Sequence, residues 1–281
     1  MFISKSMGKI STILVAGTVF AIGTIPLSAN ASEKITELKH SVYVGGLFLG
    51  SIDTEIGQDN DKYRIESVAN TSKAFDWAFK WVAKGKTVGW LNGENVTPFL
   101  HKHESTWNKN IRSATMTYDP SGSVTVETTG KKSSDPNKYT PIDPDSLTNS
   151  IDPMSAMLLV ANRLESGQGC NAEVPIFDGR RRYDVKLTEK DGRLFKPSRY
   201  SVFEGMAIGC KIEIVKKGGF KKGPDNYDRL VDEIVIWAAA PATGARVVPV
   251  RMQMETDFGS MELHLERYRD GPIQLVSRNA K

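Results

Sequence analysis

The chain has 281 residues, of which 37 are Lys or Arg and 33 are Asp or Glu, giving a formal net charge of only +4. This near balance gives no electrostatic basis for nucleic-acid binding, so we expect no nucleic-acid partner. The length is sufficient for one large or two small domains with a hydrophobic core.

The first 31 residues have the pattern of a cleavable secretion signal. Lys5 and Lys9 give a basic start, residues 10–27 carry no charge, and Ala29-Asn30-Ala31 supplies the small side chains that signal peptidase requires. We predict cleavage after Ala31, which removes two lysines and lowers the net charge from +4 to +2, and a periplasmic location. An uncleaved membrane anchor is the alternative, because the apolar run is near the lower limit of about 18 residues for crossing a bilayer. No other segment is apolar enough, so the mature chain is expected to lack a transmembrane span.

Most of the remaining sequence alternates between apolar and polar residues. The clearest runs are residues 52–56, 183–187, 211–214 and 261–266. Strict alternation predicts strands with one face on a core and the other in water, as in antiparallel sheets. Turn dipeptides such as Asn92-Gly93 separate the runs, and their spacing predicts about ten to twelve strands. A sheet this large curls or closes, so we predict a mainly β single domain over residues 32–281, built as a closed or half-open (spiral) barrel.

Two segments have helical periodicity instead. Residues 72–84 place Phe75 and Phe79 on one helical face. Residues 152–164 have Pro153 in the first turn, with Ser150 or Asp152 as the cap. We expect both helices to pack against the concave side of the sheet. The Pro-, Ser- and Asp-rich stretch 131–149 is expected to be a long surface loop or a joint between subdomains.

The two cysteines, Cys170 and Cys210, both follow the predicted signal. An oxidising compartment favours a disulfide between them, which closes a loop of about 41 residues and stabilises the fold by roughly 4 kcal/mol in the chain-entropy model. A zinc site or a catalytic thiol pair fits this wide spacing poorly.

Five segments of the mature sequence resemble one known family. They are residues 43–50, 76–81, 151–158, 174–184 and 248–251. The family is an uncharacterised group of exported bacterial proteins, catalogued as domain of unknown function 3108, and the resemblance spans roughly residues 38–270. It implies export and a curved β architecture, but it brings no activity and no catalytic residues. More loosely, the layout is similar to periplasmic spiral β-barrel envelope-integrity proteins and to lipoprotein carriers.

The predicted first helix is unusually aromatic. Phe75, Trp77, Phe79 and Trp81 lie within seven residues, and their helical projection leaves a gap occupied by lysines. One interpretation is a helix that plugs the mouth of the curved sheet. The other is an amphipathic element that touches lipid, with Trp at the interface and Lys toward anionic headgroups. These four aromatic residues are our candidates for ligand or plug contacts.

Two further groups are weaker candidates. His101 and His103 are two residues apart and share a strand face with Phe99 and Trp107, but no third metal ligand is near, so no metal is predicted. Arg180, Arg181 and Arg182 follow a turn at Asp178-Gly179 and are a possible anion site. Solvated or paired arginines are the alternative, because alternate residues of a strand point to opposite faces.

No sequence motif for a nucleophile, a phosphate loop or a dinucleotide site is present. We therefore predict a non-catalytic periplasmic protein without a cofactor, which supports the cell envelope by binding a lipid, a lipoprotein or a protein partner. The alternatives are a structural scaffold whose barrel is filled by its own side chains and a hydrolase of wall or lipid material.

Overall fold

The computed structural model describes residues 33–78, 80–130, 136–223, 233–256 and 259–280, which lie within one compact unit, residues 32–281. The predicted signal peptide falls outside the described residues. The described part of the chain is mainly β, and its helices are too short or too polar to cross a membrane.

Seven strands form the first half of the sheet as a meander, in which each strand pairs antiparallel with the next. Tight turns join most of them, and Asn60 and Gly93 take positive φ angles of 48° and 61° at two of these turns, whereas a longer connection, residues 72–80, joins the third strand to the fourth. The strands are β1 (Lys34–Val44), β2 (Leu47–Asp59), β3 (Lys62–Thr71), β4 (Trp81–Asn92), β5 (Asn95–Trp107), β6 (Asn110–Tyr118) and β7 (Val124–Thr129).

Seven more strands form the second half, again as neighbours along the chain. They are β8 (Ala172–Phe177), β9 (Arg182–Phe195), β10 (Gly205–Gly218), β11 (Ile234–Ala239), β12 (Val248–Thr256), β13 (Gly259–Asp270) and β14 (Ile273–Val276).

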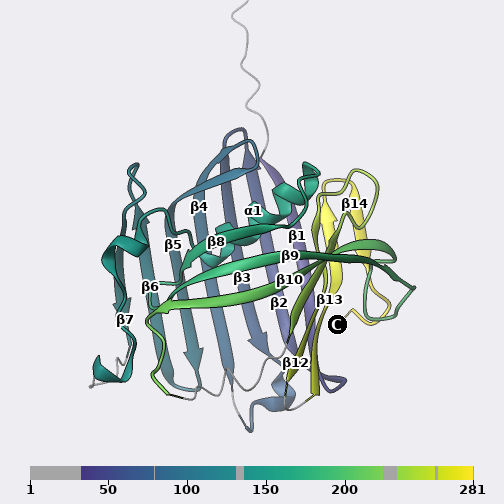
Figure 1. Cartoon of the computed structure of the whole chain (residues 1–281). Helices are drawn as coiled ribbons and strands as arrows, with labels where there is room; N and C mark the ends of the chain where they lie inside the picture. The colour runs from purple at the N-terminus through teal and green to yellow at the C-terminus, as the bar shows by residue number, and fades with distance from the viewer. Residues whose placement is uncertain (1–32, 79, 131–135, 224–232, 257–258, 281) are drawn as a thin grey trace, which may run out of the picture. The chain divides into compact units, whose positions relative to one another are not determined.

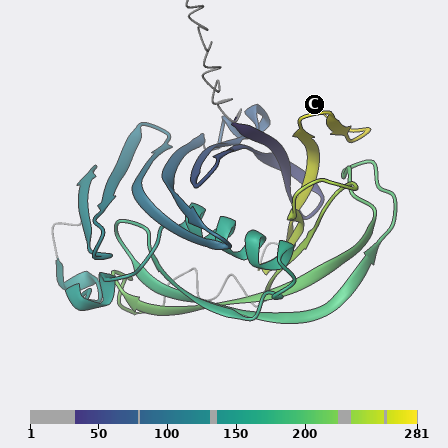
Figure 2. The ribbon, with the colours of Figure 1, turned by 90° about the horizontal axis from the view of Figure 1, so that it is seen from above.

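The two halves become one sheet because β1 pairs with β13. The strand order is β7-β6-β5-β4-β3-β2-β1-β13-β12-β11-β10-β9-β8, with β14 beside β13 (Figure 1). The sheet curves strongly, but its end strands β7 and β8 are not paired with each other (Figure 2). The predicted curved antiparallel sheet is therefore confirmed in its half-open form. The described chain has 14 strands, more than the ten to twelve predicted from the turn spacing.

One of the two predicted helices is present. This helix, α1 (Pro153–Glu165), lies on the concave side of the sheet (Figure 2). Its cap is Asp152, one of the two candidates from the sequence, and Pro153 stands in its first turn. Ala156, Leu158 and Leu164 bury the apolar face of the helix in the core.

The prediction of an aromatic helix over residues 72–84 is wrong. The described residues there form a short 3₁₀ turn, η1 (Lys73–Phe75), and β4 already begins at Trp81. The aromatic residues recur at every second position, which is the period of a strand as well as part of a wide helical arc. Tertiary pairing decides between the two, because the segment from Trp81 onward hydrogen-bonds to β3 on one side and to β5 on the other.

The segment expected to be a surface loop or a joint runs along the end of β10. Its described part contains two short 3₁₀ turns, η2 (Pro136–Lys138) and η3 (Pro144–Leu147). Tyr139 forms a bridge with Lys221, and the amide of Thr140 donates to the carbonyl of Phe220 at 2.8 Å. Residues 131–135 lie outside the described residues.

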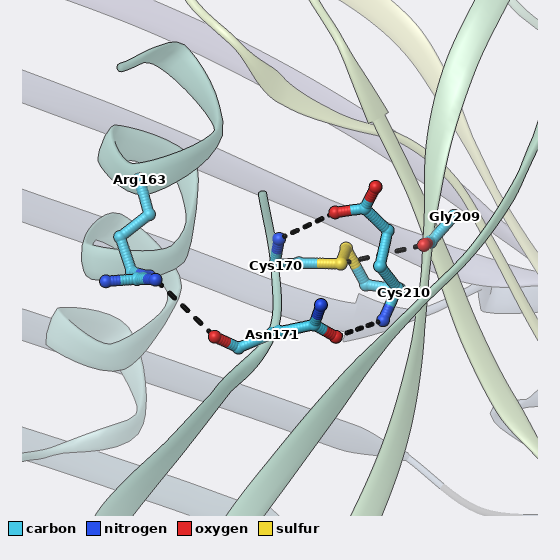
Figure 3. Close-up of a disulfide and its surroundings, with 6 residues drawn as sticks. Arg163, Cys170, Asn171, Gly209 and Cys210 are labelled. Atoms are coloured by element: carbon cyan, nitrogen blue, oxygen red, sulfur yellow. Dashed lines mark hydrogen bonds between the residues drawn. A yellow bond between two sulfur atoms is a disulfide. The ribbon is translucent and has the colours of Figure 1, made fainter. Parts of the chain in front are cut away.

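The predicted disulfide joins Cys170 to Cys210, with their Cα atoms 6.0 Å apart (Figure 3). It links the segment that follows α1 to β10, and both cysteines are buried. A guanidinium nitrogen of Arg163 on α1 donates to the carbonyl of Asn171 beside the disulfide, at 3.4 Å (Figure 3). The last turn of the helix is therefore held near β10 by a covalent and a polar link.

Candidate functional site

The candidate site is a set of apolar side chains where β10, β11, β12, β13 and β1 run side by side. Directly paired residues of antiparallel strands lie on the same face of a sheet. Two neighbouring rows of such pairs cross these five strands, and we call their ten residues the concave apolar surface. The first row is Cys210, Ile236, Met252, Leu263 and Val42; the second is Ile212, Ile234, Met254, Met261 and Val44.

Both rows face α1, which places them on the concave side of the sheet. Cys210 belongs to the core cluster that contains Ala156 and Leu164 of α1, and Ile212 packs against the same cluster. Cys210 and Leu263 are buried, whereas the other eight residues of the concave apolar surface remain partly exposed. The inner face of the sheet therefore keeps apolar area that the described residues do not cover completely.

The first row continues around the curved sheet to two tryptophans. Val42 pairs with Gly50 on β2, and Gly50 pairs with Thr71 on β3. The amide of Trp81 donates to the hydroxyl of Thr71 at 3.0 Å, and Trp81 pairs with Trp107 on β5. Both indole rings thus lie on the concave side at the end of this row.

Methionines of α1 border the same space. Met157 is 54 % exposed although its helix lies inside the curved sheet. Met154 approaches β4 at Gly85, where an added Cβ atom would lie 2.7 Å from the Met154 sulfur. Glycine at this position therefore lets the helix pack closely against the strand. Unbranched methionine side chains adapt to ligands of different shape, a property that suits a binding surface.

A buried polar cluster fixes the start of α1 beside this surface. The carboxylate of Asp152 has no exposed area and accepts hydrogen bonds from the amides of Met154 and Ser155, both at 3.0 Å. It also accepts from the hydroxyl of Thr87 at 2.9 Å and pairs with Nδ1 of His101 at 3.1 Å. Burial opposes ionisation of Asp152, but the hydrogen bonds from His101 and Ser155 outweigh it and keep the pKa of Asp152 below its usual range.

The cluster contains the Ser155 hydroxyl, an imidazole and a carboxylate, but its hydrogen bonds fix the helix and do not connect this hydroxyl to the imidazole. The Ser155 hydroxyl bonds to Asp152 and to the Tyr63 hydroxyl, the latter at 2.7 Å, rather than to His101. Ser155 has no exposed area, so no substrate reaches it. Sequence reasoning identified Asp152 as a helix cap but missed its pairing with His101, since no local pattern connects residues 51 positions apart.

His101 and His103 lie at the edge of this polar cluster. Nε2 of His101 lies 3.3 Å from Nδ1 of His103, and both face the concave side. Burial, together with the neighbouring His101, lowers the pKa of His103 and favours its neutral form. Phe99 does not share this face: a bulge in β5 turns it toward Trp90, which is itself partly exposed. Among the described residues, no group of three or more His, Cys, Asp or Glu is placed to hold a metal ion.

The four aromatic candidates are separated in the structure. Trp81 lies on the concave face, and its indole nitrogen donates to the Ser105 hydroxyl at 3.2 Å. Trp77 is 86 % exposed in the connection between β3 and β4, close in sequence to the half-buried Phe75 of η1. Phe79 lies outside the described residues. These side chains therefore do not form the single helical face that the sequence suggested.

The three arginines diverge to separate partners. A guanidinium nitrogen of Arg180 donates to the carbonyls of Thr129 at 2.6 Å and Ser113 at 3.4 Å. Arg181 forms a salt bridge at 2.9 Å with Asp178, the residue at the start of the turn. Arg182 is buried; it pairs with Asp184 and donates to the carbonyl of Ser146 at 2.8 Å. The described geometry favours three structural roles over a shared anion site.

Two shallow hollows lie on the opposite, convex face of the first half of the sheet. They measure about 260 and 410 Å³. Their linings include charged side chains, among them Glu66, Lys84, Lys86 and Lys102. They differ in this from the concave apolar surface, whose ten residues are all uncharged.

Comparison with known proteins adds family and fold. No curated protein matches this sequence. One solved structure, a crystal structure of a beta-barrel-like protein of domain of unknown function DUF1849 from Brucella abortus, is similar with a TM-score of 0.50 and 12 % sequence identity. The match covers 85 % of this chain and 97 % of that chain, and at this identity it shows the fold alone. The family model described as a protein of unknown function, DUF3108, matches residues 39–266, and the chain therefore belongs to the DUF3108 family.

Proposed function

We propose that this is an exported, non-catalytic envelope protein whose concave apolar surface binds the acyl chain of a lipid or lipoprotein. The observation that carries the proposal is the pair of apolar rows across β10, β11, β12, β13 and β1, with eight partly exposed side chains on the inner side of the sheet. The predicted signal peptide supports a location where such ligands occur.

The dimensions of the surface suit an acyl chain. Five strands at a spacing of about 4.8 Å span about 19 Å from the first strand to the last. An acyl chain in a membrane crosses about half of the roughly 30 Å hydrocarbon core, or about 15 Å. One extended chain therefore fits along the two rows, and each methylene removed from water contributes about 0.8 kcal/mol.

A self-filled scaffold is the second candidate, and a specific observation favours it as well. α1 occupies part of the concave side, and four clusters of buried apolar residues pack around the sheet. If the protein's own side chains fill the space in solution, the surface binds no lipid and function resides in partner contacts outside the barrel.

The deciding experiment is lipid retention by the purified mature chain. Organic extraction followed by mass spectrometry, and titration with a fluorescent fatty acid, are expected to show a bound acyl ligand. Met254→Glu places a charge in the second row and is expected to weaken fatty-acid binding by at least about tenfold, since burying an unpaired carboxylate is costly. The matched control is Val68→Glu on the convex face, where Val68 is 40 % exposed.

Two results would contradict the proposal. One is wild-type protein that neither carries extractable lipid nor binds the fatty acid, which supports the self-filled scaffold. The other is equal fatty-acid binding by Met254→Glu and Val68→Glu, provided that circular dichroism shows both variants folded.

A further inference from the structure

One edge of the sheet collects exposed apolar and basic side chains that the core does not use. Alternate connections of a meander fall at the same edge, so the β1–β2, β3–β4 and β5–β6 connections lie together, at the lower edge in Figure 1. Exposed apolar residues occupy all three: Leu47 is 68 % exposed, Trp77 86 %, Trp107 50 % and Ile111 54 %. We call these four residues the aromatic rim.

Hydrogen bonds hold two of these connections against each other. The amide of Lys80 donates to the side-chain oxygen of Asn108 at 2.9 Å, and the amide of Asn108 donates to the carbonyl of Lys80 at 2.7 Å. The amide of Ser72 donates to the carbonyl of Leu49 at 2.7 Å, which joins the β3–β4 connection to the start of β2. These bonds hold the three connections together along one edge of the sheet, although Trp107 and Ile111 point to opposite faces there, because Trp107 pairs with Asn110 and Ile111 pairs with Thr106.

The charge around the aromatic rim is positive. Residues 72–80 and 107–112 carry four exposed basic side chains and one exposed acidic side chain, Asp76, so their net charge is +3 (4 − 1). The basic residues are Lys73, Lys80, Lys109 and Arg112. Exposed tryptophans among lysines are typical of surfaces that lie at a membrane interface, where the indole enters the headgroup region and the ammonium groups meet anionic phosphates.

We propose that the aromatic rim docks onto the surface of an anionic phospholipid bilayer. Each basic residue near such a surface is attracted to the anionic headgroups, and Trp77 adds exposed apolar area that enters the interface. The proposal deepens the proposed function and rests on it in one respect. Trp107 belongs both to the rim and to the row of the concave face that contains Trp81. This row runs through Thr71 and Gly50 to the concave apolar surface, so an acyl chain leaving the bilayer at the rim follows it to that surface.

The test is co-sedimentation of the mature chain with vesicles of phosphatidylcholine, with and without phosphatidylglycerol. Wild-type protein is expected to bind the anionic vesicles, more weakly as salt is added. Trp77→Ser and the double variant Lys80→Glu/Lys109→Glu are each expected to bind at least about tenfold more weakly. The matched controls are Trp90→Ser, whose indole is 42 % exposed near the opposite edge, and Lys102→Glu on the convex face.

The outcomes separate the two proposals. Anionic vesicles bound equally by wild type, Trp77→Ser and the charge-reversed variant overturn docking at the rim, whatever the fatty-acid titration shows. Loss of vesicle binding in these variants, with fatty-acid binding retained, supports both proposals. Rim-dependent vesicle binding by a wild type that binds no fatty acid supports docking and rejects the acyl-chain function.

Discussion

At the scale of single residues, Asp152 joins three structural elements. It caps α1, accepts a hydrogen bond from Thr87 on β4 and pairs with His101 on β5. A buried carboxylate is tolerated only when it is fully hydrogen-bonded, and these partners satisfy that requirement. The start of the helix is therefore fixed on the concave face by this side chain.

Asp152→Asn is expected to lower the free energy of unfolding by about 3 kcal/mol at neutral pH, because it replaces a buried carboxylate that accepts hydrogen bonds from two amides and a hydroxyl. The pKa of Asp152 is lowered in the folded chain, so its contribution is present above its ordinary pKa of about 4 and is lost as pH falls below it. Urea unfolding of wild type and variant at several pH values measures this. The variant should lose less stability than wild type on acidification.

Asp143→Asn is the matched control for this prediction. Asp143 also accepts an amide hydrogen bond at the start of a turn, from Asp145 at 3.1 Å, but it is exposed. Asp143→Asn is expected to lower the free energy of unfolding by about 1 kcal/mol or less. Equal effects of the two substitutions would show that burial of Asp152 does not matter.

At the scale of elements, α1 is held at both ends. Its first turn is fixed by Asp152, and the segment after its last turn is fixed to β10 by the disulfide of Cys170 and Cys210. Between these points the helix packs on the sheet through Leu158, which contacts Tyr63 and Ile65 of β3. A helix with two fixed ends and an exposed Met157 leaves a defined apolar border for a ligand.

The double variant Cys170→Ala/Cys210→Ala is expected to lose roughly 4 kcal/mol of unfolding free energy, because the disulfide closes a loop with a sequence separation of 40 residues. The measurement is urea unfolding with and without a reducing agent. Reductant should destabilise wild-type protein and leave the variant unchanged. The same unfolding midpoint for both proteins without reductant would mean that the disulfide does not stabilise the fold.

At the scale of the whole described unit, the sheet is open, and side chains rather than strand pairing connect its ends. Arg180 follows β8 and donates to the carbonyls of Ser113 on β6 and Thr129 on β7. Phe177 of β8 packs with Met116 and Tyr118 of β6 in one buried cluster. The gap between β7 and β8 is therefore bridged without a continuous ladder.

Buried histidines make the stability of this unit sensitive to mild acid. Burial lowers the pKa of His40, and burial together with Arg251 lowers that of His264 to about 4. The unfolded chain then binds protons first as pH falls, so stability present above about pH 6.5 is lost as pH falls toward about 4. The urea midpoint of wild type is expected to be lower at about pH 5 than at about pH 7.

The double variant His40→Gln/His264→Gln checks the origin of this loss. It is expected to be less stable at neutral pH, because His40 donates to the carbonyl of Pro249 at 2.9 Å, but to depend less on pH over the same range. A variant whose midpoint falls with pH as steeply as that of wild type would assign the loss to other groups.

The local sequence pattern was sufficient to predict several structural features. Alternation in runs such as residues 261–266 predicted strands and an antiparallel curved sheet, and the sheet is of that kind. Asp152 followed by Pro153 predicted the start of α1, and two cysteines after a predicted export signal predicted the disulfide. Each of these predictions depends on short stretches of sequence that can be interpreted without the fold.

The sequence pattern gave a wrong prediction where the spacing of apolar residues was compatible with both a helix and a strand. Residues 72–84 satisfy both a helical and a strand period, and the hydrogen bonds that β4 makes to β3 and β5 decided for the strand. The concave apolar surface was also beyond sequence reasoning, because its rows combine residues as distant as Val42 and Met252. By itself the sequence determined the strands, the helix cap and the disulfide; only the tertiary structure decided which apolar side chains face inward together, because strand pairing joins residues whose separation along the chain leaves no local signal.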